Sequence, residues 1–342
     1  MTKKEEYRLT KQVKIYGWSC KLGANQLDEL LEKAGLKGFI EDAAIVPIPN
    51  SDMVQVKSID IFTPLVDEPE IMGEISACNV TNDIFAMNVP EVSGMLVFLA
   101  INKNTPMNIA EGILRGIKRF MEQKISSKVV GGHTIYNEWP LIGGEASGFV
   151  NKNNLIRKHG VKKGDKLLLT KPIGLQAIMA AYRLQKDFPD MLEEYSSKEL
   201  NKSIKLAIDL MTTSNQGVVK TIYTYDDFSF IHAMTDVTGF GLSGHLKEML
   251  QNSELSAIIE TIPSLKLSKN LSEELGYAFD DCTCSETAGG MLLAIDPSKV
   301  EDFSNTLSSN GISNWVVGTI DNRADELVRI SKKVKQIEIT KI

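Results

Sequence analysis

The sequence predicts an α+β protein of two domains. Three observations support this prediction: a length of 342 residues, a composition with 43% apolar and 24% charged residues, and strand patterns that alternate with helix patterns. A chain of this kind can bury a large core. Residues 151–154 are polar and have no apolar period, so we place the boundary there, between a domain of residues 1–153 and a domain of residues 154–342.

The first domain begins with a loop and a short helix. Leucines at 27, 30 and 31 have helical spacing and Gly35 follows them, which predicts a helix over 25–33. Two longer helix patterns follow over 70–87 and 109–121, the second with one apolar stripe. Apolar or alternating runs predict strands over 43–46, 53–61, 95–101, 128–130 and 146–150.

The second domain has the same mixture of elements. A strand is predicted over 166–170, and helices are predicted over 174–185, 197–211 and 242–250. A glycine-rich segment with Gly239 and Gly241 precedes the last of these helices, and two closing strands are predicted over 291–295 and 314–319. No internal repeat interrupts this order.

The charge and the cysteines exclude several classes of protein. The net charge is −6, and no lysine or arginine run lies beside aromatic residues, so we expect no nucleic-acid partner. No apolar run approaches the roughly 18 to 20 residues of a membrane span, and the N-terminus is charged, so we expect a cytoplasmic protein without a membrane partner. The four cysteines are too few for a disulfide framework and are expected to be free thiols: Cys20, Cys78, Cys282 and Cys284.

Four aspartates interrupt apolar sequence at the edges of predicted elements: Asp42, Asp60, Asp83 and Asp236. Each one alone is explained equally well as a helix cap or a strand-end residue. Together they favour a magnesium site that binds a polyphosphate, because buried carboxylates need a positive partner and Mg²⁺ prefers oxygen ligands. Asn79 precedes Asp83 by four residues and shares its helix face, so it either joins this ligand set or is a buried amide satisfied by the backbone.

Other residue types are consistent with phosphate binding but are weak signals alone. Lys21 lies in the loop before the first helix, where its ammonium can reach a phosphate, although a lone loop lysine is usually only solvated. Gly131-Gly132-His133 offers backbone that approaches a ligand closely, but its spacing matches neither the Walker nor the dinucleotide motif. His133 and His245 are each explained well as ordinary structural histidines.

The ordered series of motifs resembles the selenophosphate synthetase family, also called selenide, water dikinase. The resemblance covers nearly the whole chain, whereas the wider superfamily with aminoimidazole ribonucleotide synthetase shares only the acidic pattern. The motifs that carry it are Cys20-Lys21-Leu22, Glu41-Asp42-Ala43-Ala44, the segment 58–67, the segment 79–87, Gly131-Gly132-His133, the segment 169–174, the segment 235–245 and Thr287-Ala288-Gly289-Gly290.

The resemblance implies a fold and a reaction. The fold is that of aminoimidazole ribonucleotide synthetase, in which the N-terminal sheet pairs with its copy in a homodimer to form a β-barrel and an α+β domain lies beside it. ATP is expected in the cleft between the domains. The implied reaction converts ATP, selenide and water into selenophosphate, AMP and phosphate with the help of Mg²⁺.

The resemblance also assigns roles to residues. It implies that Lys21 is the essential lysine and that Asp60 helps to hold the phosphate and metal cluster, with Asn79 beside it. The implied magnesium ligands are Asp42, Asp83 and Asp236. The implied nucleotide contacts, made across the dimer in one version of this hypothesis, are Gly131, Gly132 and His133.

The N-terminal loop departs from the family pattern. The family carries cysteine or selenocysteine where this chain has Trp18, and an indole cannot ionise to a soft nucleophile. Cys20 matches the family's second cysteine and is either a substitute nucleophile or an unreactive thiol. The sequence therefore leaves three hypotheses in order: a selenophosphate synthetase, a paralogue that transfers phosphate to another small acceptor such as sulfide, and a non-catalytic nucleotide-binding regulator.

Overall fold

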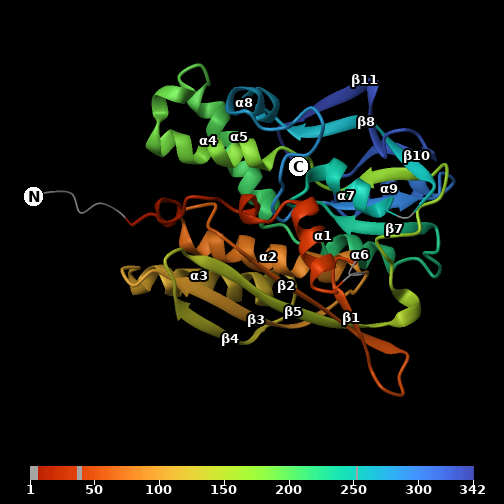
Figure 1. Cartoon of the computed structure of the whole chain (residues 1–342), viewed down its shortest axis with the longest axis horizontal. Coiled ribbons are helices and arrows are strands. Elements are labelled where there is room, and N and C mark those ends of the chain that lie inside the picture. The colour runs from red at the N-terminus through yellow and green to blue at the C-terminus, as the bar shows by residue number, and fades with distance from the viewer. Residues whose placement is uncertain (1–6, 37–40, 252) are drawn as a thin grey trace, which may run out of the picture.

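The computed structural model describes residues 7–36, 41–251 and 253–342. In these ranges the chain forms a five-stranded sheet from its first half and a six-stranded sheet from its second half, with helices on their faces (Figure 1). This is the mixed α+β content that the sequence predicts. No helix in the described ranges is long and apolar enough to cross a membrane.

The first sheet is antiparallel except at one edge, where β3 and β4 run parallel. Its strands, in spatial order, are β1 (Ala44–Pro47), β2 (Met53–Phe62), β5 (Leu141–Asn151), β3 (Val92–Ile101) and β4 (Val129–Tyr136). All five of the strands predicted in this half are present, and several are longer than predicted.

Helices α2 (Pro69–Ala86) and α3 (Met107–Arg119) pack together on one face of this sheet. A short π-helical turn, Phe120–Lys124, extends α3. The helices approach so closely that a Cβ on Gly116 would lie 1.9 Å from the carbonyl oxygen of Glu70, which explains the glycine. α2 is buried on nearly all sides because it also contacts β7 and α5 of the second half.

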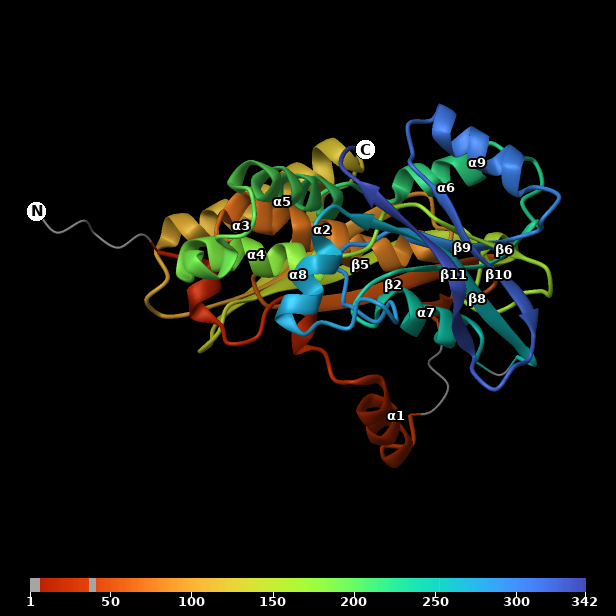
Figure 2. The same ribbon diagram turned by 90° about the horizontal axis from the view of Figure 1, so that it is seen from above.

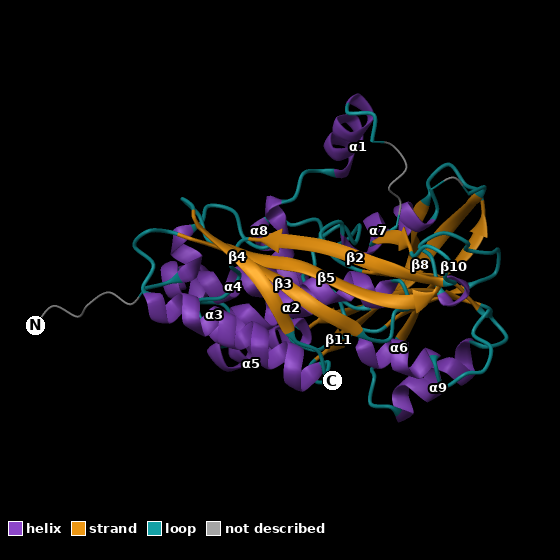
Figure 3. Cartoon of the chain, turned by 90° about the horizontal axis from the view of Figure 1, so that it is seen from below, coloured by secondary structure: helices purple, strands orange, loops and turns teal. Residues whose placement is uncertain are grey.

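The opposite face of the first sheet is open (Figure 3). Ile59, Leu96 and Phe149 lie on this face and are 67%, 45% and 44% exposed. The strand register places Ile59 opposite Glu145, Glu145 opposite Leu96, and Leu96 opposite Gly131, so these four residues form a row across the sheet, and Phe149 lies four residues further along β5, opposite Gln55. Exposed apolar side chains gathered on one face of a sheet are typical of a surface that another protein covers.

The second sheet is antiparallel except for the pair β11 and β8. Its spatial order is β11 (Val328–Ile339), β8 (Leu255–Leu265), β10 (Trp315–Asn322), β6 (Lys166–Leu169), β9 (Met291–Ile295) and β7 (Ile231–Asp236). Its helices are α4 (Leu175–Asp187), α5 (Ser197–Met211), α6 (Gln216–Ile222), α7 (Gly241–Met249), α8 (Ser268–Leu275) and α9 (Val300–Ser309). Short 3₁₀ turns lie at Lys152–Asn154 and Pro189–Leu192.

The N-terminal segment packs against the body before α1 (Ala24–Lys33) projects away from it (Figure 2). The segment contains 3₁₀ turns at Leu9–Gln12 and Trp18–Cys20. Thr63 Oγ1 donates a hydrogen bond of 2.7 Å to the carbonyl of Ile15, and Arg8 Nε lies 2.7 Å from Asp67 Oδ2. The described part of this segment is therefore anchored to the body at Arg8 and at Ile15.

Two features of the fold differ from the sequence prediction. The strand predicted over 128–130 continues as β4 to Tyr136, because Gly131 and Gly132 pair with β3 instead of ending it. A Cβ on Gly132 would lie 2.3 Å from the carbonyl oxygen of Val97, so glycine permits a close strand contact here. In addition, β7, β8, β11, α6, α8 and α9 were not identified from the sequence.

Candidate active site

A cavity of about 660 Å³ lies between the two halves of the chain and is unusually rich in charge. The four aspartates predicted from the sequence all line it, although they come from four different segments. Lys21 and Trp18 of the N-terminal segment also line it. The structure thus brings together the predicted metal ligands and the predicted lysine.

Asp60 and Asp83 enter the cavity from β2 and α2. Asp60 lies two residues before the end of β2, and Asn79 Nδ2 donates a hydrogen bond of 2.8 Å to Asp60 Oδ2. Asp83 lies one turn further along α2, where the hydroxyl of Ser58 donates to its carboxylate. The helical spacing of Asn79 and Asp83 therefore directs both toward β2, as the sequence predicts.

Asp42 and Asp236 close the other side of the cavity. Asp236 is the last residue of β7, and the neighbouring Thr235 hydroxyl donates a hydrogen bond of 3.0 Å to Asp42 Oδ1. Lys158 Nζ forms ion pairs with Asp42 Oδ1 at 2.5 Å and with Glu248 at 3.0 Å. The Oδ2 atoms of Asp42 and Asp236 are buried and accept no hydrogen bond within the described chain.

Burial and mutual repulsion raise the pKa values of three of these carboxyl groups. Burial, followed by the charge of Asp83, raises the pKa of Asp60 and of Asp236 well above the ordinary value. Burial and the charge of Asp42 raise the pKa of Asp83 to about 6. Lys21 acts in the opposite direction on Asp60 and Asp83. A cation placed among these groups would relieve both penalties.

The donor set therefore fits a hard divalent cation. Carboxylate oxygens are the ligands that Mg²⁺ prefers, and two of them have no other partner in the described chain. As the side chains stand, no three acidic, histidine or cysteine groups of the described residues converge closely enough to hold a metal. The Asp42 carboxylate is paired with Lys158 instead. A bound cation must therefore either share this carboxylate with Lys158 or displace the lysine from it.

His245 and Thr238 hold Glu248, the second carboxylate that pairs with Lys158. The backbone N–H of Thr238 donates a hydrogen bond of 3.0 Å to His245 Nε2, so the proton of the imidazole is on Nδ1, which lies 3.0 Å from Glu248. Although burial opposes ionisation, His245 and Lys158 lower the pKa of Glu248 to about 2. His245 is thus a structural histidine, in line with its simplest interpretation from the sequence.

Lys21 is held at the rim of the cavity between two aromatic rings. Its Nζ lies 4.5 Å from the ring centroid of Phe240 and 5.3 Å from that of Trp18. A Cβ on Gly239 would lie 3.3 Å from Lys21 Cδ, so this glycine leaves room for the lysine. The aromatic faces favour a cation in this position and orient it toward the carboxylates.

Trp18 is part of the core. Its side chain is 8% exposed, and its indole stacks on Phe62 with ring centroids 5.3 Å apart. The indole Nε1 and the backbone N–H of Ala288 both donate to Asn79 Oδ1, at 3.0 and 2.9 Å. The amide of Asn79 is therefore satisfied within the chain, by the side chains of Trp18 and Asp60 and by one backbone N–H rather than by the backbone alone, and its contact with a ligand stays a prediction.

Five predicted site residues do not line this cavity: Asn79, whose contacts are given above, Gly131, Gly132, His133 and Cys20. Gly131 and His133 lie on the open face of the first sheet, and Gly132 is three strands away from Asp60 in the register. Within one chain they cannot contact a ligand at the aspartates, so their proposed role requires a second chain. Cys20 is exposed and lines neither this cavity nor a smaller cavity that Trp18 also lines. Its role as a nucleophile stays a prediction.

Four residues that hold the aspartates were not predicted from the sequence: Lys158, Glu248, Ser58 and Thr235. Lys158 follows Arg157 and precedes His159, so it resembles a solvated basic cluster although it is 5% exposed. Its position beside the apolar Ile156 was the one available signal of burial. Glu248 lies on a helix that shows an ordinary amphipathic pattern, and only the fold reveals its partners.

Comparison with known families matches both halves of the chain. The family described as AIR synthase related protein, N-terminal domain, matches residues 40–150, and its C-terminal domain matches residues 162–330. Among solved structures, "AaThiL complexed with AMPPCP and TMP" has a TM-score of 0.68 at 17% identity and covers 97% of each chain. "Hydrogenase Maturation Protein HypE in complex with ATP" has a TM-score of 0.63 at 15% identity and covers 90% of this chain and 89% of that one. These structures show the fold.

The curated relatives are more specific. A selenide, water dikinase of Methanocaldococcus jannaschii is 36% identical and covers 98% of this chain and 99% of its own length. A selenide, water dikinase of Methanococcus maripaludis is 37% identical and covers 96% of this chain and 100% of its own length. Such identity over both complete lengths identifies the family: the chain belongs to the selenide, water dikinases, within the AIR synthase related fold.

Proposed function

We propose that this chain is a magnesium-dependent selenophosphate synthetase that converts ATP, selenide and water into selenophosphate, AMP and phosphate. The observation that carries the proposal is the convergence of Asp42, Asp60, Asp83 and Asp236 with Lys21 on one cavity, in a chain of this family. A site of this composition suits phosphoryl transfer, where most of the catalysis is positioning and charge stabilisation.

The aspartates divide into metal ligands and a supporting group. Asp42, Asp83 and Asp236 would hold Mg²⁺, and their repulsion together with the two unpartnered oxygens supports this assignment. Bound Mg²⁺ supplies charge neutralisation for the polyphosphate. Asp60, fixed by Asn79, would complete the cluster, and Lys158 would balance its remaining negative charge.

Lys21 would contact the transferring phosphoryl group. It is the cation at the rim of the cavity that lowers the pKa values of Asp60 and Asp83, and its aromatic neighbours orient it without neutralising it. Two phosphoryl units leave ATP in the overall reaction, so that one is bonded to selenium and the other is released as phosphate after water adds. A fixed ammonium stabilises the negative charge that develops on the oxygens in such steps.

We further propose that the active form is a homodimer in which the open faces of two first sheets meet as a barrel. The exposed side chains of Ile59, Leu96 and Phe149 on this face support the arrangement, because their contact with water is unfavourable. Gly131 and His133 on the same face would then contact nucleotide bound to the partner chain.

A second candidate is favoured by Trp18. The indole is buried and hydrogen-bonded at the position where the family resemblance places a reactive chalcogen, so selenide delivery through residue 18 is excluded. Transfer to another small acceptor, such as sulfide, follows the same geometry. A non-catalytic regulator is less favoured, because it has no physical need for four clustered carboxylates and Lys21.

Phosphorus NMR of the products tests these alternatives. The full-length protein is incubated with ATP, Mg²⁺ and anaerobic selenide, beside samples with sulfide or no acceptor. A selenophosphate signal together with AMP is the expected result. Equal turnover without selenide would indicate another acceptor, and no turnover in any sample would make the regulatory role the leading hypothesis.

A further inference from the structure

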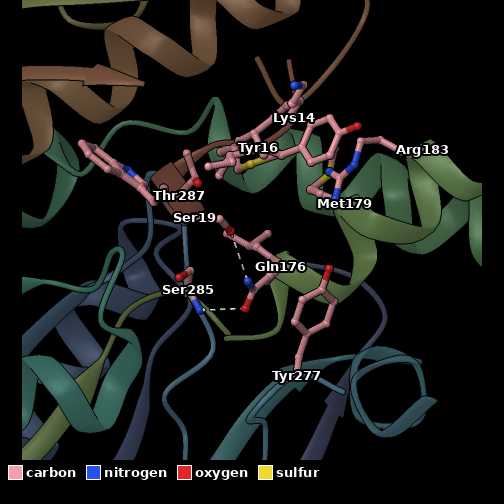
Figure 4. A pocket seen from close by; sticks show the side chains of 14 residues that line it. Lys14, Tyr16, Ser19, Gln176, Met179, Arg183, Tyr277, Ser285 and Thr287 are labelled. Atoms are coloured by element: carbon pink, nitrogen blue, oxygen red, sulfur yellow. Dashed lines mark hydrogen bonds between the residues drawn. The ribbon is translucent and has the colours of Figure 1, made fainter. Parts of the chain in front are cut away.

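A second, smaller cavity of about 230 Å³ is lined by residues of the N-terminal segment and of the second half of the chain, Arg183 and Tyr277 among them (Figure 4). Within the described chain, Trp18 is the one residue that lines both cavities. The two cavities have opposite chemistry. The larger contains the four aspartates, whereas the smaller is lined by two cationic side chains, Arg183 and Lys14, and by no carboxylate.

Arg183 is a guanidinium without an ionic partner. It lies 3.9 Å above the ring centroid of Tyr16, and no described residue accepts a hydrogen bond from it or forms an ion pair with it. The nearby carboxylates of Asp67 and Asp187 are engaged by Arg8. Burial lowers the pKa of Arg183, which reflects the missing partner. A mostly buried cation of this kind is costly unless an anion completes it.

Neutral donors surround the same space. Gln176 connects Ser19 of the N-terminal segment with Ser285, through Nε2 to Ser19 Oγ at 3.4 Å and from the Ser285 N–H to Oε1 at 3.0 Å (Figure 4). The hydroxyl groups of Tyr277 and Thr287 line the cavity and form no hydrogen bond with another described residue. They are therefore available to an occupant.

The remaining wall of the cavity is apolar and contains polarisable sulfur atoms. Met179 and Met211 contribute two thioethers, and Leu65 and Leu175 complete this side. Such a wall does not suit a phosphate, whose several charged oxygens each need a donor. It suits a small, polarisable, weakly hydrated monoanion, which meets one weakly hydrated guanidinium and a sulfur-rich surface. Hydrogen selenide and hydrogen sulfide give such monoanions in neutral water.

We propose that this cavity binds the hydroselenide or hydrosulfide anion beside Arg183, as the site of the second substrate, with the Trp18 indole as the wall toward the aspartates. The identification of the anion as a substrate rests on the proposed function, but its binding does not. Placing the two substrates in adjacent cavities keeps the anion away from the carboxylates, which would repel it, until phosphate and metal are in place.

The test measures anion binding and turnover separately on the full-length protein. Calorimetric titration with anaerobic sodium hydroselenide, sodium hydrosulfide and sodium phosphate is made without ATP on the wild type, Arg183→Met and Arg183→Lys. We expect the Kd of hydroselenide to rise roughly tenfold or more in Arg183→Met and to recover partly in Arg183→Lys. In turnover, the KM for selenide rises by a similar factor while the KM for ATP changes less than about twofold.

Two further variants protect the test against a loss of folding. Tyr277→Phe removes one unpaired hydroxyl and leaves the packing intact, so we expect a two- to fivefold rise in Kd, about the value of one lost hydrogen bond. Arg115→Met, on the exposed side of α3, is the matched control and should change nothing.

The outcomes separate the two proposals. An unchanged Kd in both Arg183→Met and Tyr277→Phe, or tighter binding of phosphate than of hydroselenide, would overturn the assignment of this cavity. If the wild type makes selenophosphate but Arg183→Met has a normal KM for selenide, the proposed function stands and the second site fails. If no selenophosphate forms while Arg183-dependent binding persists, the site stands and the proposed function fails.

Discussion

The indole N–H of Trp18 and the side-chain oxygen of Asn79 form a buried hydrogen bond of 3.0 Å that ties the N-terminal segment to α2. Since Asn79 also donates to Asp60, the position of a loop residue is linked to the position of a carboxylate in the cavity. This link distinguishes the loop from a free lid.

Trp18→Cys is expected to destabilise the protein and not to increase selenide-dependent turnover. The change leaves a cavity against Phe62 and removes a donor from Asn79, at a cost of roughly 3–5 kcal/mol. Chemical denaturation and turnover with anaerobic selenide measure both effects, with Trp139→Cys at a partly exposed position as control. A marked gain in selenide turnover would show instead that the missing chalcogen was the sole defect.

Asp236→Asn is expected to abolish magnesium-dependent ATP turnover and to raise the melting temperature of the metal-free protein. The carboxylate is buried among like charges, so its removal relieves repulsion in the folded state. Thermal melts with and without Mg²⁺ and ATP test this, because the variant should lose the stabilisation by ligand. Asp52→Asn on the surface serves as control. Retained magnesium-dependent turnover in Asp236→Asn would disprove the metal assignment.

Lys21→Met is expected to lower kcat by roughly 10²-fold or more with little change in the free energy of unfolding, because the exposed lysine stabilises developing charge. Steady-state kinetics and a thermal melt measure the two quantities. Lys33→Met, at an exposed ion pair of α1, is the matched control. If Lys21→Met lowered the melting temperature so far that unfolding accounted for the loss of kcat, Lys21 would have a structural role.

Glu286 is expected to make the protein less stable as the pH rises from about 4.5 to about 8. Burial raises its pKa to about 8, although the N–H groups of Gly174 and Leu175 donate to its carboxylate. The folded state therefore binds a proton that the unfolded state releases, and stability is present below pH 4.5 and lost through pH 8. At about 1.4 kcal/mol per pKa unit, the upper bound is about 5 kcal/mol.

Denaturation curves of the wild type and Glu286→Gln at several pH values isolate this contribution. The difference between their unfolding free energies should shrink or reverse as the pH rises, because glutamine does not titrate. A constant difference between pH 5 and pH 8.5 would mean that the two backbone donors keep Glu286 ionised throughout.

Ile59→Asp is expected to convert the proposed dimer into monomers and to reduce turnover. The side chain lies in the open row of the first sheet, where a charge opposes burial. Light scattering after size-exclusion chromatography gives the mass. Met107→Asp on α3, where an apolar side chain is 73% exposed outside this row, is the control. A wild-type monomer, or an Ile59→Asp dimer, would contradict the proposed interface.

The sequence identified the aspartates because each one interrupts apolar residues, and the structure places them together. It did not identify Lys158, since a basic residue between Arg157 and His159 resembles a solvated cluster, and the nearby apolar Ile156 is too weak a sign of burial by itself. It also ended β4 too early, because a glycine pair predicts a turn unless the neighbouring strand is known.

Distant pairings were equally out of reach. The parallel contact of β11 with β8 joins residues far apart in sequence, and no local pattern encodes it. Arg183 lies on an ordinary helix pattern, and its lack of a partner is a property of the folded chain alone.

Helix α2 has a further consequence for how the molecule moves. It contacts strands of both sheets and carries Asn79 and Asp83 in its second half, so the two halves cannot rotate against each other without disturbing the carboxylates. The aspartate geometry is therefore preset before any substrate arrives. Since Trp18 ties the N-terminal segment to α2, adjustment during a catalytic cycle must come from α1, which projects from the body (Figure 2), so this chain has a rigid interior and one movable helix at its edge.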